Sequence, residues 1–172
     1  MPTHPSQGRA PLTLRIDREL THPQVIELLR EHLAGMHAES PPDKVHALDL
    51  GALRQPRITF LTAWRQGNDD GQADHQLVAF GAIKELDPLH GELKSMRTTA
   101  RHLRQGAAQA ILTELLAIAA RRGYARVSLE TGSTHGFEPA MAMYRRFGFV
   151  ETGPFADYPV DPFSRFMTLK MV

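Results

Sequence analysis

The pattern of apolar and polar residues predicts a strand followed by a helix at the start of the chain. Residues 12–18 alternate between apolar and polar side chains, which is typical of a half-buried strand. Apolar residues then recur at helical spacing from Val25 to Leu33. We expect this helix to be capped by Thr21 and to end near His37.

A hairpin is predicted next, because two strand-like segments flank a polar turn. The segments are residues 57–64 and 77–84, and the turn between them, residues 67–74, consists almost entirely of Gly, Asn, Asp and other polar residues. This arrangement predicts antiparallel strands with a long exposed tip. The pattern over residues 45–53 leaves a short helix and an irregular loop equally open.

The second half of the chain alternates strands and helices. Strands are predicted at 92–98, 126–131, 148–150 and 165–171, and helices at 106–122 and 139–147. Antiparallel strands around a central strand–helix–strand unit indicate a mixed α/β fold. We expect one domain spanning residues 12–172, preceded by a flexible tail of residues 1–11.

Composition excludes several kinds of chemistry. The 172 residues contain no cysteine, which excludes disulfides, thiolate metal sites and a cysteinyl acyl-enzyme. The nine histidines form no metal-binding motif, so we expect no metal. A net charge of +1 favours neither nucleic acid nor a membrane surface as a partner. With no long apolar run and no secretory signal pattern, we expect a cytoplasmic monomer or homodimer.

The segment 96–112 carries the clearest chemical signal. A strand ends there, a basic turn with Arg101 and Arg104 follows, and a helix begins beside the small residues Gly106, Ala107 and Ala108. Unpaired backbone N–H groups at a helix N-terminus attract phosphate, and small residues let it approach. A phosphate or pyrophosphate site is one interpretation. The other is a solvated basic turn before a closely packed core helix. The Walker A and dinucleotide-binding glycine motifs are both absent.

Residues 92–149 resemble the core of the GNAT superfamily of N-acetyltransferases. The resemblance rests on the strand before the turn, the turn itself and a later helix, which read Glu-Leu-Lys-Ser-Met-Arg-Thr, Leu-Arg-Gln-Gly-Ala-Ala and Ala-Met-Ala-Met-Tyr-Arg-Arg-Phe-Gly-Phe. Flanking phrases, including Gly-Pro-Phe-Ala-Asp-Tyr at 153–158, are similar to a bacterial subgroup of acetyltransferases. The resemblance implies an α/β fold: a mixed, mostly antiparallel sheet flanked by helices.

The resemblance also implies a binding site for acetyl-coenzyme A. The backbone of Met96 and Thr98 would hold the pantetheine arm, and Tyr144 would face the thioester sulfur. The pyrophosphate would lie on Leu103, Arg104, Gln105, Gly106, Ala107 and Ala108. The chain departs from the family pattern at Leu103, where Arg or Gln is usual, and at Phe137, where Asn is frequent.

The implied reaction is direct acetyl transfer to the primary amine of a small molecule in a ternary complex. Tyr144 would protonate the departing thiolate, and Glu92 or Glu130 would accept the proton of the amine. His46 is a candidate for the substrate pocket. The alternatives are transfer of a different acyl group, a protein amine as acceptor, and a coenzyme A-binding module without catalysis.

Overall fold

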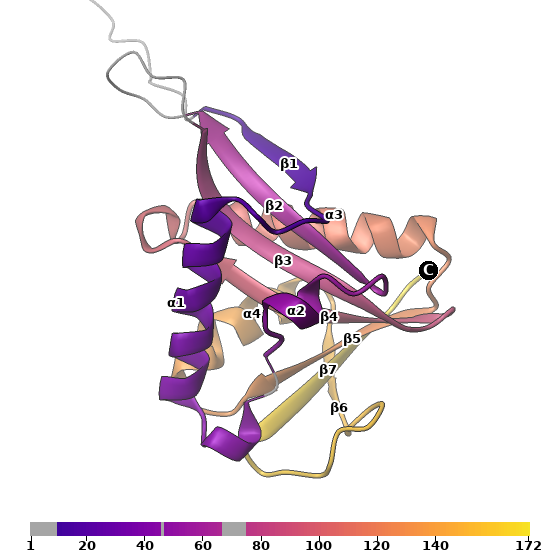
Figure 1. The fold of residues 1–172 in the computed structure, drawn as a ribbon. Coiled ribbons are helices and arrows are strands. Elements are labelled where there is room, and N and C mark those ends of the chain that lie inside the picture. The colour runs from indigo at the N-terminus through magenta and orange to yellow at the C-terminus, as the bar shows by residue number, and fades with distance from the viewer. Residues whose placement is uncertain (1–9, 46, 67–74) are drawn as a thin grey trace, which may run out of the picture.

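The computed structural model describes residues 10–45, 47–66 and 75–172, which form one seven-stranded sheet covered by helices on both faces (Figure 1). The strands are β1 (Leu12–Ile16), β2 (Ile58–Gln66), β3 (His75–Asp87), β4 (His90–Thr98), β5 (Arg126–Gly132), β6 (Val150–Thr152) and β7 (Ser164–Lys170). The α-helices are α1 (Pro23–Glu39), α2 (Leu50–Leu53), α3 (Ala107–Arg121) and α4 (Glu138–Arg146). The strand order across the sheet is β1-β2-β3-β4-β5-β7-β6.

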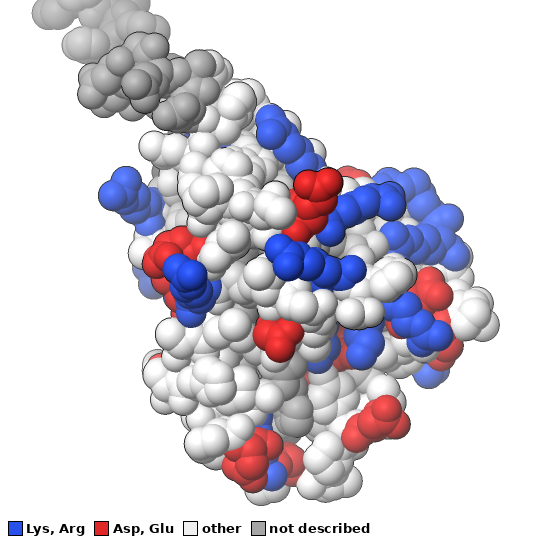
Figure 2. All heavy atoms as spheres, in the orientation of Figure 1, with Lys and Arg blue, Asp and Glu red and all other residues white. Residues whose placement is uncertain are grey.

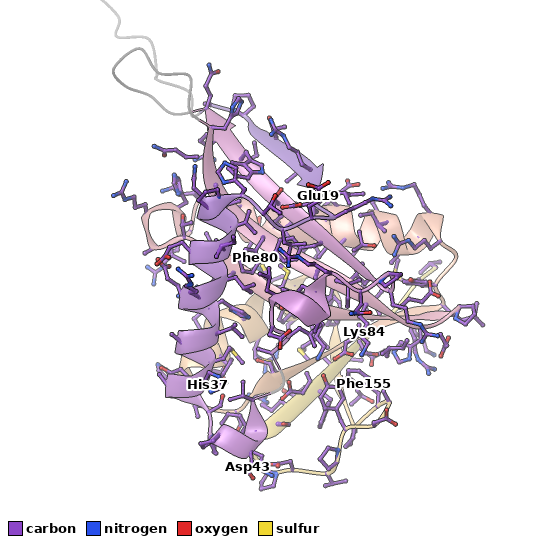
Figure 3. All side chains as sticks on the ribbon, viewed as in Figure 1. Glu19, His37, Asp43, Phe80, Lys84 and Phe155 are labelled. Carbon is purple, nitrogen blue, oxygen red and sulfur yellow. The ribbon has the colours of Figure 1, made fainter. Side chains whose placement is uncertain are left out.

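The two faces of the sheet have separate hydrophobic cores. Helices α1 and α2 cover one face, where Phe60, Trp64 and Phe80 pack beneath Val25 and other apolar residues of α1. In Figure 3, Phe80 lies between β3 and α1. Helices α3 and α4 cover the opposite face and pack on apolar residues of the central strands. The central strands therefore present alternate side chains to a different pair of helices.

The predicted order of strands and helices is confirmed, and the bounds of several elements differ: the strand expected at 148–150, for example, is β6 at Val150–Thr152. Helix α1 is capped by His22, not Thr21, because the Nδ1 atom of His22 accepts a hydrogen bond from the Gln24 amide at 3.2 Å. Strand β3 is longer than expected. The segment 45–53, for which a helix and a loop were both open, contains the four-residue helix α2. The Asp49 carboxylate caps this helix by accepting a hydrogen bond from the Ala52 amide at 2.8 Å. The predicted hairpin tip, 67–74, and most of the tail lie outside the described residues.

Strands β4 and β5 are parallel neighbours that separate partway along their length. Their pairing runs from His90 opposite Arg126 to Leu93 opposite Leu129 and stops there. Beyond that point β4 continues beside β3, and β5 continues beside β7. A bulge occurs in β4 at this point, where Ser95 has a φ of 54°. Bulges bend a strand and increase its twist, so β4 turns away from β5 (Figure 1).

None of the described helices combines the length and apolar character needed to cross a membrane.

Helix α1 carries a histidine that is held neutral in the folded protein. His32 is 7% exposed and packs edge-on against Phe80, with ring centroids 5.9 Å apart. Burial, and then the positive charge of Arg97, lowers the pKa of His32 from 6.5 to about 4. Between about pH 4 and pH 6.5, the unfolded chain therefore carries a proton on His32 and the folded chain does not.

The free energy of unfolding should consequently fall as the pH is lowered through this range. The total fall due to His32 is about 3 kcal/mol, and it is complete once the pH is below about 4, where the folded chain binds the proton too. Urea denaturation of the wild type and of His32→Leu at several pH values measures this change in the free energy of unfolding. His37→Gln is the control, because His37 is exposed. Parallel pH dependence of wild type and His32→Leu would contradict the assignment.

Candidate active site

The turn between β4 and α3 presents backbone N–H groups to open space. Gly106 precedes the helix with a φ of 85°, in the left-handed region that favours glycine. A Cβ atom at this position would have no heavy atom within 4 Å. The amides of Ala107, Ala108 and Gln109 are in the first turn of α3, where no intrahelical acceptor exists. The helix end is therefore suited to an anion that approaches the backbone closely.

Side chains add positive charge and rigidity to this turn. Arg101 and Arg104 are exposed, and Arg104 has a φ of 59°. Gln105 donates a hydrogen bond to the Arg101 carbonyl at 3.0 Å and accepts one from Arg65 Nη1 at 3.1 Å. Leu103, which occupies the position where the resemblance leads one to expect Arg or Gln, is 57% exposed. The positive charge thus comes from arginines around the turn and not from position 103.

Strand β4 leads from the sheet into this turn. From Lys94 to Thr98, β4 has no neighbour on its β5 side among the described strands, because the parallel pairing ends at Leu93. Met96 lies on the α3 face, where its sulfur approaches the space beside Gly81. The β5-facing edge of this segment is therefore open to another extended chain, which could hydrogen-bond to the backbone as a strand does.

Tyr144 projects from α4 into the core on the α3 and α4 face. It is 6% exposed, and its ring centroid lies 5.7 Å from that of Phe149. Burial raises the pKa of Tyr144 well above its usual range, so the phenol keeps its proton at neutral pH. Its hydroxyl makes no hydrogen bond within the described part of the chain. Tyr144 is thus a packed core residue whose phenol is neutral.

A buried network of charged and polar groups lies on the other face, where β4 leaves β5. Glu92 is 2% exposed, and its Oε1 atom lies 3.1 Å from Lys94 Nζ. Tyr158, from the connection between β6 and β7, donates a hydrogen bond to Glu92 and accepts one from Lys94 at 2.6 Å. Burial, followed by the nearby charges of Glu92 and Glu130, raises the pKa of Tyr158 well above its usual range.

Glu130 belongs to the same face of the sheet. Its neighbour Leu129 packs in the α3 and α4 core, so Glu130 points to the α1 side, as does Glu92 beside Leu93. Glu130 is half-buried and accepts a hydrogen bond from Ser164 Oγ at 2.9 Å. Both predicted carboxylates therefore lie at the point of strand separation, on the side opposite Tyr144.

Two of the residues brought together here were not singled out from the sequence. Tyr158 lies 66 positions from Glu92, and Lys94 is an ordinary residue of an alternating strand. The signal that could have found Tyr158 is the phrase Gly-Pro-Phe-Ala-Asp-Tyr, which carried part of the resemblance. The predicted pocket residue His46 lies outside the described residues.

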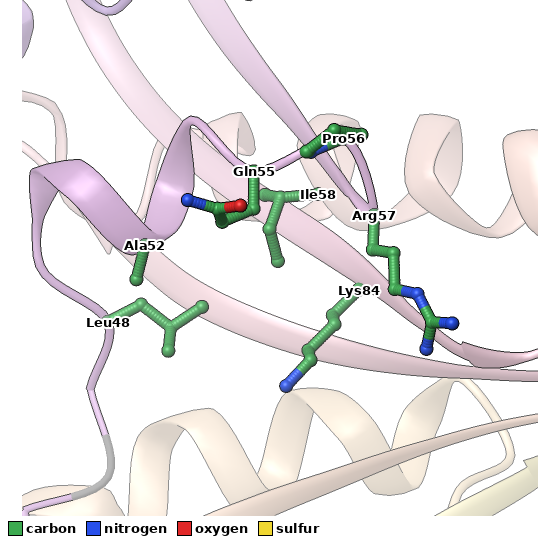
Figure 4. A pocket seen from close by; sticks show the side chains of 7 residues that line it. All are labelled: Leu48, Ala52, Gln55, Pro56, Arg57, Ile58 and Lys84. Carbon is green, nitrogen blue, oxygen red and sulfur yellow. The ribbon is translucent and has the colours of Figure 1, made fainter.

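Two hollows open on the α1 and α2 side of the sheet. The smaller, about 440 Å³, lies between α2 and the adjoining strands and is lined by Leu48, Ala52, Gln55, Pro56, Arg57, Ile58 and Lys84 (Figure 4). The larger, about 760 Å³, reaches from the start of β4 and β5 to the β6–β7 connection and shares Arg57 and Lys84. Phe155 lines it and packs against Tyr158, with ring centroids 5.1 Å apart.

Charged side chains of both signs line the larger hollow. The basic residues are Arg57, Lys84, Arg126 and Lys170, and the acidic residues are Glu85, Asp87 and Asp157. Figure 2 shows Lys and Arg crowded where α3 ends and β4 and β5 begin. Neither hollow is lined by Tyr144 or by the turn before α3. Among the described residues, no cluster of three or more His, Asp or Glu could hold a metal ion.

Comparison with known proteins gives one family. The model of the acetyltransferase (GNAT) family matches residues 23–149. The uncharacterized N-acetyltransferase YsnE of Bacillus subtilis is 51% identical over 92% of this chain and 99% of its own length. The uncharacterized N-acetyltransferase YedL of Escherichia coli is 45% identical over 92% of this chain and 94% of its own. An IAA acetyltransferase of Azospirillum brasilense is 35% identical over 84% of this chain and 86% of its own.

Solved structures share the fold. A crystal structure of a putative acyl-CoA N-acyltransferase from Klebsiella pneumoniae has a TM-score of 0.73 and 26% identity, and it covers 94% of this chain and 98% of its own. A Bacillus subtilis acetyltransferase solved in complex with CoA has a TM-score of 0.65 at 15% identity, over 94% of this chain and 100% of its own.

Proposed function

Because this chain belongs to the acetyltransferase (GNAT) family, we propose that it transfers an acetyl group from acetyl-coenzyme A to the primary amine of a small molecule. The observation that carries the proposal is the opening between β4 and β5, which leads to the N-terminus of α3. An extended thioester arm and a pyrophosphate are the two parts that these features would bind.

The donor would lie along β4. Its pantetheine arm would hydrogen-bond to backbone groups between Met96 and Thr98, on the edge that β5 leaves free. Its pyrophosphate would accept hydrogen bonds from the amides of Ala107 and Ala108, with Gly106 leaving room and Arg101 adding charge. This role uses the left-handed Gly106 and the open space beside it, which a helix that merely packs would not need.

The chemical step joins the amine nitrogen to the acetyl carbon and breaks the bond between that carbon and sulfur. The amine must first lose a proton, because an ammonium has no lone pair. The departing thiolate then takes a proton, which the neutral Tyr144 would donate from the α4 side. With no cysteine in the chain, transfer would proceed directly within a ternary complex.

The proton acceptor would be Glu92 or Glu130, because both carboxylates lie at the strand separation on the α1 side. Glu92 is the more buried and is bridged by Tyr158 to Lys94, so a proton reaching it would pass through this network. Glu130 is the more accessible and has Ser164 as a hydrogen-bond donor. Donor and acceptor would thus enter from opposite faces of the sheet.

Initial rates with acetyl-coenzyme A and a panel of amines, read by release of free thiol, test the proposal. The panel contains amino acids, polyamines, aminoglycosides and a peptide N-terminus, and IAA, the compound named for the Azospirillum relative, is assayed beside it. We expect turnover of a small amine with intersecting, sequential rate patterns. Binding of acetyl-coenzyme A without turnover of any acceptor would favour the non-catalytic alternative. Parallel rate lines would contradict direct transfer.

Substitution of Gly106 by Glu should abolish binding of acetyl-coenzyme A. The new carboxylate would stand beside the pyrophosphate, and such juxtaposed like charges cost several kcal/mol, so the dissociation constant should rise by about 100-fold or more. Isothermal calorimetry measures the change.

Gly123 at the other end of α3 offers a matched control. It has a φ of 77° and equally open surroundings, so Gly123→Glu introduces the same backbone strain away from the turn. Equal weakening in both variants would trace the effect to strain and contradict the pyrophosphate site.

Substitution of Tyr144 by Phe should lower kcat by about 10²- to 10⁴-fold, because the ring remains and only the proton donor is lost. The KM for acetyl-coenzyme A should change little. Since burial raises the pKa of Tyr144, loss of the proton limits the wild-type rate only above pH 10.

Tyr124→Phe is the control for this substitution, because it removes a hydroxyl that donates to Glu85 at 3.0 Å, away from the opening. If Tyr144→Phe has the same kcat as this control, Tyr144 is not the acid, and the thiolate departs without a proton from the protein.

A further inference from the structure

Arg97 lies on β4 beyond the bulge and points beneath α1. It is paired across the sheet with Phe80, whose side chain packs under α1, so the two share that face. Gly35 of α1 lies close to this side chain, because a Cβ atom at Gly35 would be 3.5 Å from Arg97 Nη1. The guanidinium group therefore lies between strand and helix.

The guanidinium group of Arg97 has no counter-ion among the residues that the structure describes. Its Nε atom is buried and has no hydrogen-bond partner, and the side chain makes no ion pair within the ranges that the structure describes. The Oγ atom of Ser95, two residues earlier, is likewise buried without a partner. Buried polar groups in folded proteins are nearly always hydrogen-bonded. The Nε atom of Arg97 therefore has a donor to offer to a partner that the described residues do not supply.

The position of α1 places Arg97 at the open end of the separated strands. One helical turn beyond Gly35, the Glu39 carboxylate lies near Gly136 and the Thr134 hydroxyl, which follow the end of β5. Helix α1 therefore extends from β4 across to the segment after β5, as Figure 1 shows. A molecule that entered the opening from the α1 side would meet Arg97.

Among the charged and titratable groups near Arg97, Arg97 itself is the one suited to bind an anion. On the same strand face, Lys94 contacts Glu92 and Tyr158. His32, on α1, is kept neutral. Arginine presents a planar fork of N–H donors that matches a carboxylate with two hydrogen bonds.

We propose that Arg97 binds a carboxylate group of the acceptor, so that the acceptor class is amines that also carry a carboxylate, as amino acids do. The inference rests on the proposed function, since it concerns the acceptor of that reaction. The carboxylate would hold the acceptor at Arg97 while its amine points along β4 toward the donor. Arg97 is then a specificity-determining residue.

The experiment compares pairs of acceptors that differ in the carboxylate alone. Each pair consists of an amino acid and the amine left by removal of its carboxylate, for example phenylalanine with phenethylamine and tyrosine with tyramine. The amino acid amide serves as a third, uncharged member. Rates are measured with wild type, Arg97→Met and Arg97→Lys. Arg30→Met is the control, because Arg30 is an exposed residue of α1 whose ion pair with Glu27 lies on the surface.

We expect the wild type to prefer the carboxylate-bearing member. Arg97→Met should raise the KM for that member by about 10- to 100-fold and remove the preference, while the KM for acetyl-coenzyme A stays unchanged. Arg97→Lys should restore part of the effect, because it keeps the charge without the planar fork. Thermal unfolding of each variant shows that the fold is retained.

Two failures are distinguishable. If calorimetry shows that acetyl-coenzyme A binds, three results would overturn the inference. They are equal rates for both members of every pair, turnover of neither member, and a preference that survives in Arg97→Met. Absence of acetyl-coenzyme A binding to the wild type overturns the proposed function itself.

Discussion

The separation of β4 from β5 after four paired residues is the feature on which the rest of the structure depends. Parallel strands in the middle of a sheet normally satisfy each other's backbone groups along their full length. Here β5 instead continues with β7, and β4 continues with β3 through a bulge at Ser95. The opening leaves one edge of β4 without a strand and directs it toward the turn before α3.

The opening also separates two chemical environments. On the α3 and α4 face, Tyr144 lies in an apolar core that keeps its phenol protonated. On the α1 face, Glu92, Lys94 and Tyr158 form a buried polar network, and Arg97 lies beyond it under α1. A reaction that releases a proton from one substrate and delivers one to the other needs different groups on its two sides. The sheet supplies this difference because successive side chains of one strand face opposite sides.

The pattern of apolar residues alone predicts the order of the elements and most of their positions, because each long helix has one buried face and the central strands are apolar on both faces. It does not settle α2, since four residues are too few to show a period. It also assigns the cap of α1 to Thr21, although a ring nitrogen of His22 performs that role. The turn before α3 and Tyr144 could be proposed from the sequence because their residues are adjacent in sequence or belong to a family motif. Tyr158 and Arg97 were missed because their significance depends on contacts with distant segments and on burial.

A crystal structure of the protein with coenzyme A would test the central claim most directly, namely that the opening between β4 and β5 is the donor site. The account predicts that the pantetheine arm hydrogen-bonds to the backbone of β4 between Met96 and Thr98. It also predicts that the pyrophosphate lies within hydrogen-bond distance of the amides of Ala107 and Ala108. Coenzyme A bound instead in the hollow beside α2, with the edge of β4 still open, would contradict it.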